Sequence, residues 1–116
     1  MRGLTTLKNR TTYDTVRELG LAMKDVQEGT SYGTPSLKVK KKFLLRLKED
    51  GESIAIKIGF DDREILMNAN PEVFYITDHY RDYPAMLVHL SSVTRDQLSD
   101  VLTIAYRFVT SKRTSR

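Results

Sequence analysis

Apolar residues near the start of the chain recur at helical spacing. Tyr13, Val16 and Leu19 stand three positions apart, and two threonines come directly before them. Residues three or four apart share one face of a helix, and threonine is a favourable N-cap. The pattern predicts a first helix over residues 13–23. Within it, Gly20 costs about 1 kcal/mol relative to alanine unless a neighbouring element packs closely against it.

A stretch rich in glycine, serine, threonine and proline follows at residues 29–35. These residue types favour turns, so we predict turns with at most a short extended piece. Gly33 is expected to adopt a positive φ, which glycine tolerates. We interpret the stretch as a turn rather than a phosphate-binding loop, because it lacks the Gly-Lys-Ser/Thr ending and does not lead directly into a helix.

Alternating apolar residues next predict three strands. They occupy odd positions in the first two strands and even positions in the third. Successive side chains of a strand point to opposite faces. For the apolar residues of all three strands to share the core face, the loop between the first and second strands, Lys40 to Lys42, must have an odd number of residues. The loop between the second and third strands, residues 49–52, must have an even number. A lysine in the left-handed region of a three-residue loop costs about 1 kcal/mol. The apolar positions are Leu37 and Val39, then Phe43, Leu45 and Leu47, then Ile54, Ile56 and Ile58.

The same alternation gathers positive charge on the outer face of these strands. Residues 36–48 contain six cations and no anion. We expect Leu44 to accompany them on that face, because its neighbours take the core positions. The predicted outer face carries Lys38, Leu44, Arg46, Lys48 and Lys57, with Lys40, Lys41 and Lys42 in the loop.

The second half of the chain predicts a short helix, two strands and a long helix. Asp61 and Glu64 have the spacing of a capping box, and the helix that they begin ends before Asn70-Pro71. Thr94 and Gln97 form a second such pair, ahead of an apolar stripe that continues to about residue 110. Strands are predicted at residues 73–76 and 86–90, and a polar aromatic loop at residues 77–84 separates them.

These elements follow the order α-β(3)-α-β(2)-α. Short connections between strands favour an antiparallel sheet, and the helices are expected to cover one of its faces. The sequence thus predicts a two-layer α+β fold whose other face is open to solvent or to a partner. We expect one domain over residues 11–111, between a flexible N-terminal arm at residues 1–10 and a basic C-terminal tail at residues 112–116.

The composition fits this reading. A chain of 116 residues, 40% hydrophobic and 29% charged, can bury a single core without stabilising cross-links such as disulfides or metal ions. It has no cysteine, and no apolar run approaches the ~18 residues of a membrane span. With no signal-peptide pattern at the N-terminus, we expect a cytoplasmic protein that does not associate with membranes. Two histidines and no cysteine give no metal-ligand cluster, so no metal or cofactor is predicted.

Several short motifs stand in order along the chain. They are Glu28-Gly29-Thr30-Ser31-Tyr32-Gly33-Thr34-Pro35, Lys38-Val39 with Phe43, Glu49-Asp50-Gly51-Glu52, Pro71-Glu72-Val73-Phe74 and His79-Tyr80-Arg81-Asp82-Tyr83-Pro84. Together they resemble the YjbR/MmcQ-like proteins over nearly the whole chain after the N-terminal arm. Relatives often carry glycine where this chain has its three-lysine loop.

The resemblance implies a two-layer α-β(3)-α-β(2)-α fold, similar to secretion-chaperone-like and frataxin-like arrangements. Members of the family are commonly labelled DNA-binding, by their likeness to a double-wing domain of a phage transcription factor. The resemblance implies no enzymatic activity.

Positive charge and aromatic rings provide two candidate sites. The first is a basic hairpin wing from Lys38 to Lys48 that contacts phosphates, for which affinity would fall steeply with salt. Its alternative is a solvated edge that prevents strand-to-strand aggregation. The second site is Tyr80 and Arg81, beside Tyr83, where rings could stack on bases; the alternative is a loop packed on the sheet edge. The nucleic-acid-binding residues that we predict are Lys38, Lys40, Lys41, Lys42, Arg46, Lys57, Tyr80 and Arg81.

The sequence therefore favours a small non-enzymatic binding protein whose partner is duplex DNA. The rival is a protein-interaction module, whose open sheet face, including Leu44, docks a peptide or a second copy of the chain. An enzyme ranks third. Asp78-His79 with Ser31 or Ser36 is only a sequence pattern, and a catalytic triad is recognised by its geometry.

Overall fold

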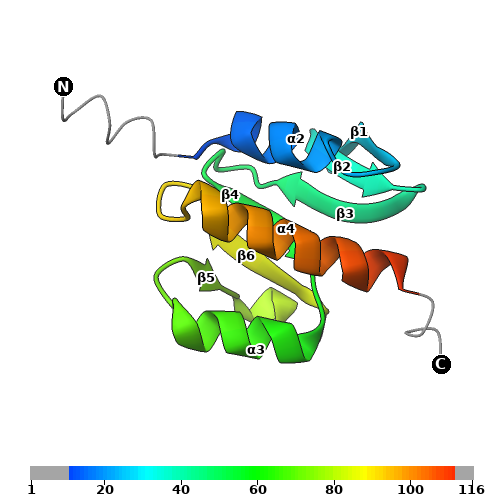
Figure 1. The fold of residues 1–116 in the computed structure, drawn as a ribbon. Helices are drawn as coiled ribbons and strands as arrows, with labels where there is room; N and C mark the ends of the chain where they lie inside the picture. The colour runs from blue at the N-terminus through cyan, green and yellow to red at the C-terminus, as the bar shows by residue number, and fades with distance from the viewer. Residues whose placement is uncertain (1–10, 112–116) are drawn as a thin grey trace, which may run out of the picture.

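A computed structural model describes residues 11–111. The predicted N-terminal arm and basic tail lie outside the described residues. The elements in chain order are α2 (Tyr13–Leu21), β1 (Val26–Ser31), β2 (Thr34–Val39), β3 (Lys42–Leu47), β4 (Ser53–Lys57), α3 (Phe60–Ala69), β5 (Phe74–Tyr75), the 3₁₀-helix η1 (Asp78–Tyr80), β6 (Ala85–His89) and α4 (Arg95–Thr110) (Figure 1).

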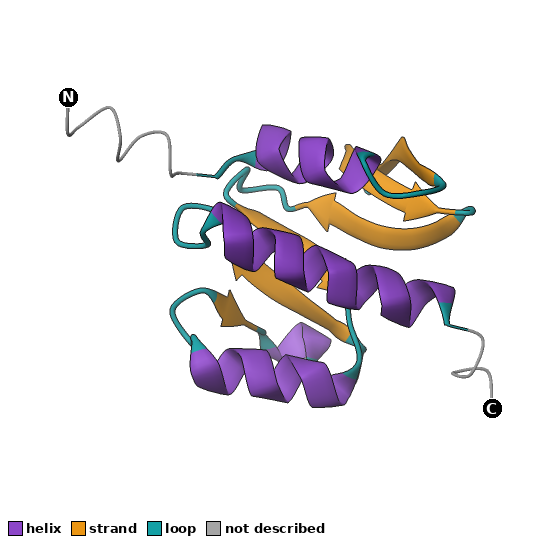
Figure 2. Ribbon diagram, viewed as in Figure 1, coloured by secondary structure: helices purple, strands orange, loops and turns teal. Residues whose placement is uncertain are grey.

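The strands form one six-stranded antiparallel sheet in the order β1-β2-β3-β4-β6-β5. Figure 2 shows α2 and α4 on the near side of these strands. Side chains from all three α-helices pack against one core cluster on that side. The predicted two-layer α+β fold is confirmed, with one strand more than expected before α3.

The additional strand is β1, in the stretch where only turns and a short extended piece were predicted. It pairs along its length with β2, and the two-residue turn between them is Tyr32-Gly33, with φ values of 54° and 81°. The positive φ expected at Gly33 is confirmed. The strand escapes detection because it lies at the edge of the sheet, where Val26 alone of its residues is buried and no apolar alternation is needed.

The next hairpin corrects the predicted strand phase. Its turn has two residues rather than three, Lys40 and Lys41, both with positive φ (50° and 74°). The register shifts beside Leu37, so that β3 carries an extra residue at a bulge. As a result Leu44 is fully buried in the core, and the expectation that it faces outward is wrong.

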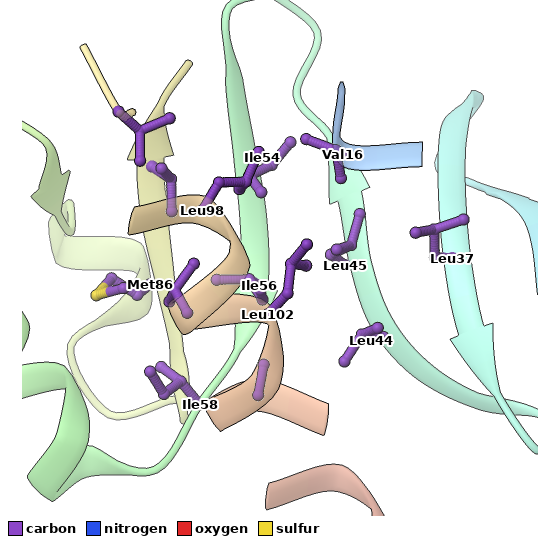
Figure 3. Packing of buried hydrophobic residues seen from close by; sticks show 14 of the residues in the cluster. Val16, Leu37, Leu44, Leu45, Ile54, Ile56, Ile58, Met86, Leu98 and Leu102 are labelled. Carbon is purple, nitrogen blue, oxygen red and sulfur yellow. The ribbon is translucent and has the colours of Figure 1, made fainter. Parts of the chain in front are cut away.

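Figure 3 shows the core that results. Leu44 and Leu45, neighbours in sequence, lie among the apolar side chains of the helix-covered face, together with Ile56 and with Leu102 from α4. At its edge, Gly20 of α2 is so close to Leu37 that a Cβ there would overlap the leucine side chain. The close packing that would justify a glycine in this helix is therefore present.

The sequence predicted the N-terminal cap of α4 correctly but not that of α3. The capping box at the start of α4 forms as predicted: the Gln97 N–H donates to Thr94 Oγ1 at 3.0 Å, and the Thr94 N–H donates to Gln97 Oε1 at 2.9 Å. In contrast, α3 begins one residue before Asp61 with Gly59 at its N-cap, and the box predicted from Asp61 and Glu64 does not form.

Candidate functional site

The face of the sheet away from the α-helices holds a groove of about 880 Å³. The strand register shows which side chains share this face: Lys38 lies opposite Phe43, Arg46 opposite Ala55, and Ala55 opposite Leu87. The described residues that line the groove are Ser31, Tyr32, Lys38, Lys41, Phe43, Arg46, Lys48, Ala55, His79, Tyr80, Tyr83 and Ala85.

The floor of the groove is made of small side chains. Ala55 and Ala85 are almost fully buried and pack with Leu87 and the ring of Tyr80 in a second apolar cluster. Alanine at these two positions leaves depth that a larger side chain would fill. The cations of the neighbouring strands thus border a hollow rather than a flat sheet.

One wall of the groove is the segment of residues 78–84, which the buried guanidinium of Arg63 holds in place. Arg63 is only 5% exposed. Its Nη1 donates to the carbonyls of Tyr80 (2.9 Å), Tyr83 (2.9 Å) and Ala85 (3.1 Å), and its Nη2 donates to the carbonyl of Arg81 (3.0 Å). A single side chain of α3 therefore fixes the wall through its backbone.

The opposite rim carries an aromatic ring over a buried cation. Tyr32, in the turn between β1 and β2, is 85% exposed, and the Arg46 guanidinium lies 4.9 Å from its ring centroid. Arg46 is 8% exposed, and its Nη1 donates to Thr34 Oγ1 (3.2 Å), to the Leu47 carbonyl (3.3 Å) and to Glu49 Oε2 (3.3 Å). Within residues 11–111, its Nε and Nη2 make no hydrogen bond.

Two lysines repeat the pairing of cation and ring. Lys48 Nζ donates to the Tyr80 hydroxyl at 3.1 Å and lies 5.4 Å from that ring centroid. Lys57 Nζ lies 4.8 Å from the ring centroid of Tyr83, which is 46% exposed. Cations and aromatic rings therefore alternate around the groove, in contacts that are attractive through the ring quadrupole.

A carboxylate stands at the margin of this site without lining it. Glu49 lies 3.3 Å from Arg46 Nη1 and 3.9 Å from Lys48 Nζ. A hydrogen bond from its own backbone N–H, followed by the charges of Arg46 and Lys48, holds the pKa of Glu49 below its usual value. The group is therefore ionised at neutral pH and competes with any anionic ligand for these two cations.

The structure brings together some of the predicted site residues. Lys38, Lys41, Arg46 and Tyr80 line the groove, and Lys57 reaches the same face through its contact with Tyr83. Lys38 and Lys41 form no ion pair with a described residue. These five residues occupy the open face, as the sequence predicted for its cations.

Three predicted residues lie elsewhere. Lys42 pairs with the buried Val39, so the register places it toward the helical side, where it lines a smaller pocket with Phe108 of α4. Lys40 lies 3.9 Å from the Asp25 carboxylate at the hairpin tip. The Arg81 side chain turns outward and contacts Asp78 at 2.7 Å. The expectation that the three lysines of the turn share one exterior face is therefore wrong.

Sequence reasoning missed Tyr32 and Phe43 as site residues. Tyr32 was treated as part of a turn, although an exposed tyrosine in a two-residue hairpin turn is an unusual placement for an apolar ring. Phe43 was assigned to the core, but the bulge turns it toward the open face, opposite Lys38. No signal in the sequence marks the bulge.

The histidines take up aromatic contacts. The His79 ring packs edge-on against Tyr80, with 5.1 Å between centroids, and His89 stacks on Tyr75 at 4.1 Å on the open face. No hydrogen bond joins His79 to a serine or carboxylate in the part of the chain that the structure describes. Within the same residues, no three metal-ligating side chains lie close enough to hold an ion. None of the described helices is long and apolar enough to cross a membrane.

Comparisons with known proteins agree with this architecture. A family model described as YjbR matches residues 21–108. The crystal structure of the Deinococcus radiodurans protein DR2400, with domain DUF419, superposes with a TM-score of 0.74 at 21% sequence identity, covering 90% of this chain and 82% of that one. A comparison with curated proteins found no match.

Proposed function

We propose that this chain, which belongs to the YjbR family, is a non-enzymatic nucleic-acid-binding protein whose interface is the groove on the open face of its sheet. Lys38, Lys41 and Lys57 contact phosphates, and the guanidinium of Arg46, beneath Tyr32, adds a further contact. A cytoplasmic location, where nucleic acid is accessible, is part of this proposal.

The lining of the groove supports the proposal. Of the described residues that line it, four are lysine or arginine, four are tyrosine or phenylalanine, and none has a carboxylate. Neutralising phosphates releases counterions and drives association with nucleic acid, and rings beside cations add stacking. Contacts to phosphates position a protein on nucleic acid without reading the sequence, so weak sequence preference is expected.

A protein segment docked on the same face is the second candidate. The exposed rings of Tyr32 and Tyr83 favour it, because aromatic residues are enriched at protein interfaces. Leu44, expected to take part, is buried and cannot contribute. The two candidates differ in their response to salt, since a docked apolar segment releases few counterions.

A salt titration tests the proposal. Fluorescently labelled oligonucleotides, in single- and double-stranded form, are titrated with the full chain, and the dissociation constant is followed from low to physiological salt. Lys38→Gln with Lys41→Gln should lower affinity about tenfold at low salt and reduce the slope of log affinity against log salt by roughly two.

The matched control is Lys24→Gln with Arg107→Gln. It removes the same charge from exposed positions in the turn after α2 and on α4, outside the groove. This pair should change affinity by less than about twofold. Equal losses in the two double variants would contradict the groove as the interface, and no binding of either oligonucleotide at low salt would contradict nucleic-acid binding itself.

A further inference from the structure

We infer that the groove binds an unpaired, single-stranded segment in preference to a duplex. The inference rests on the proposed function and adds whether the nucleic acid is bound as a single strand or as a duplex. Two observations carry it: where the exposed rings are, and how deep the cations lie.

The exposed rings need free base faces. Tyr32 and Tyr83 are the two exposed tyrosines among the described residues of the groove, at 85% and 46% exposure, and each is backed by a cation at about 5 Å. A ring gains stacking energy only from a base whose face is uncovered. In a duplex both faces of each base are covered by neighbouring base pairs, so these rings would meet only sugar and phosphate.

The cations lie within the hollow as well as on its rims. Arg46 is 8% exposed and lies beneath Tyr32, and Lys48 is bonded to Tyr80 of the wall. A duplex is a stiff rod that would rest on the rims and reach Lys41 and Lys57 but not the deeper cations. The groove volume of about 880 Å³ is within the ~300–1,000 Å³ of small-molecule sites, which suits a few flexible nucleotides.

The experiment compares probes of one sequence and one label. They are single-stranded DNA, single-stranded RNA, the DNA duplex, and an abasic DNA strand of the same length, each titrated by fluorescence anisotropy at fixed salt. At least one of the single strands is expected to bind about tenfold or more tightly than the duplex. The abasic strand, which keeps the phosphates and lacks the bases, is expected to bind like the duplex.

Variants of the rims separate stacking from charge. Tyr32→Ala and Tyr83→Ala should each weaken single-strand binding roughly fivefold or more and leave duplex binding unchanged, because stacking contributes only to the former. Tyr32→Phe and Tyr83→Phe keep the rings and should restore binding. Ile65→Ala, at an exposed apolar residue of α3 outside the groove, is the control and should have no effect. Circular dichroism confirms that each variant is folded.

The outcomes distinguish the two proposals. A duplex that binds as tightly as both single strands, or alanine variants that weaken both ligands equally, would overturn the single-strand inference and leave nucleic-acid binding intact. If none of the probes binds even at low salt, the proposed function itself is wrong.

Discussion

The two faces of this sheet are formed by the same strands but carry different kinds of side chain. The core face carries branched aliphatic residues under three helices, whereas the open face carries alanines, cations and aromatic rings. Phe43 and Leu44 show the contrast most directly: they are neighbours on β3, yet one lines the groove and the other is fully buried. If the proposed function is correct, stability depends on one face and binding on the other, and single substitutions should affect one or the other.

The largest expected effect is on stability, and it tests the contrast between the neighbouring residues Leu44 and Phe43. Leu44→Ala should lower the free energy of unfolding by about 2–5 kcal/mol, because it leaves a cavity in a packed core. Phe43→Ala, at a half-buried residue that lines the groove, should cost less than half of that but weaken oligonucleotide binding. Urea denaturation and anisotropy measure the two quantities. Equal stability losses at both positions would mean that the bulge does not separate the faces.

The second prediction concerns the link between the faces. Arg63→Met removes the donor for four backbone carbonyls and should destabilise the protein by about 2–4 kcal/mol. It should also make residues 78–84 sensitive to limited proteolysis. Arg81→Met, which removes only an exposed ion pair with Asp78, serves as control and should cost under about 1 kcal/mol. A cleavage pattern unchanged by Arg63→Met would show that the wall is held by other contacts.

The third prediction uses the two hairpin turns. Both require two left-handed residues, but one has Tyr32-Gly33 and the other has Lys40-Lys41. Replacing Lys40 by Asn and Lys41 by Gly supplies the residues that such turns favour and should raise the melting temperature, with a gain of about 1 kcal/mol in the free energy of unfolding. The same variant should bind oligonucleotides more weakly because Lys41 lines the groove. A lower melting temperature would contradict the assigned turn geometry.

A finer test compares the two lysines of that turn. Lys41→Gln should weaken binding by about threefold, whereas Lys40→Gln, at a residue beside Asp25 and outside the groove, should leave it nearly unchanged. Anisotropy titrations at one low salt concentration measure both. Equal effects would indicate that the hairpin tip, rather than the groove, meets the nucleic acid.

The smallest expected effect comes from the competing carboxylate. Glu49→Gln frees Arg46 and Lys48 from their anionic neighbour and should raise affinity about twofold at neutral pH. Because the pKa of Glu49 is held below its usual value, acidification through that lowered pKa should raise the affinity of the unmodified protein, and the variant should lack this pH dependence. A loss of affinity in Glu49→Gln would mean that the carboxylate positions Arg46 for the ligand.

The sequence predicted those features whose causes are local or periodic. The long helix with its Thr94 and Gln97 cap, and the strands with alternating Ile54 and Ile56, depend on neighbours in the chain and were found. Strand β1 was missed because an edge strand needs no apolar alternation. Leu44 was assigned to the wrong face because the extra residue at the bulge in β3 reverses which face of the sheet the following positions of the strand point to.

The groove was predicted less well than the fold, since its parts are distant in sequence. Four of the predicted binding residues line it and Lys57 lies on the same face, but their separation from Lys40, Lys42 and Arg81 depends on the bulge and on ion pairs across turns. The contact of Arg63 with the carbonyls of residues 80–85 spans about twenty positions and leaves no periodic trace.

The four carbonyls that share the guanidinium of Arg63 have a further consequence for the groove. Since α3 packs against the core on its other side, the wall can open only if the bonds of Arg63 break or the helix is displaced. The amide protons of Tyr80, Tyr83 and Ala85, which are bonded within the wall or next to it, should therefore exchange slowly with solvent. A ligand would then enter a preorganised site and would lose little affinity to the ordering of a loop.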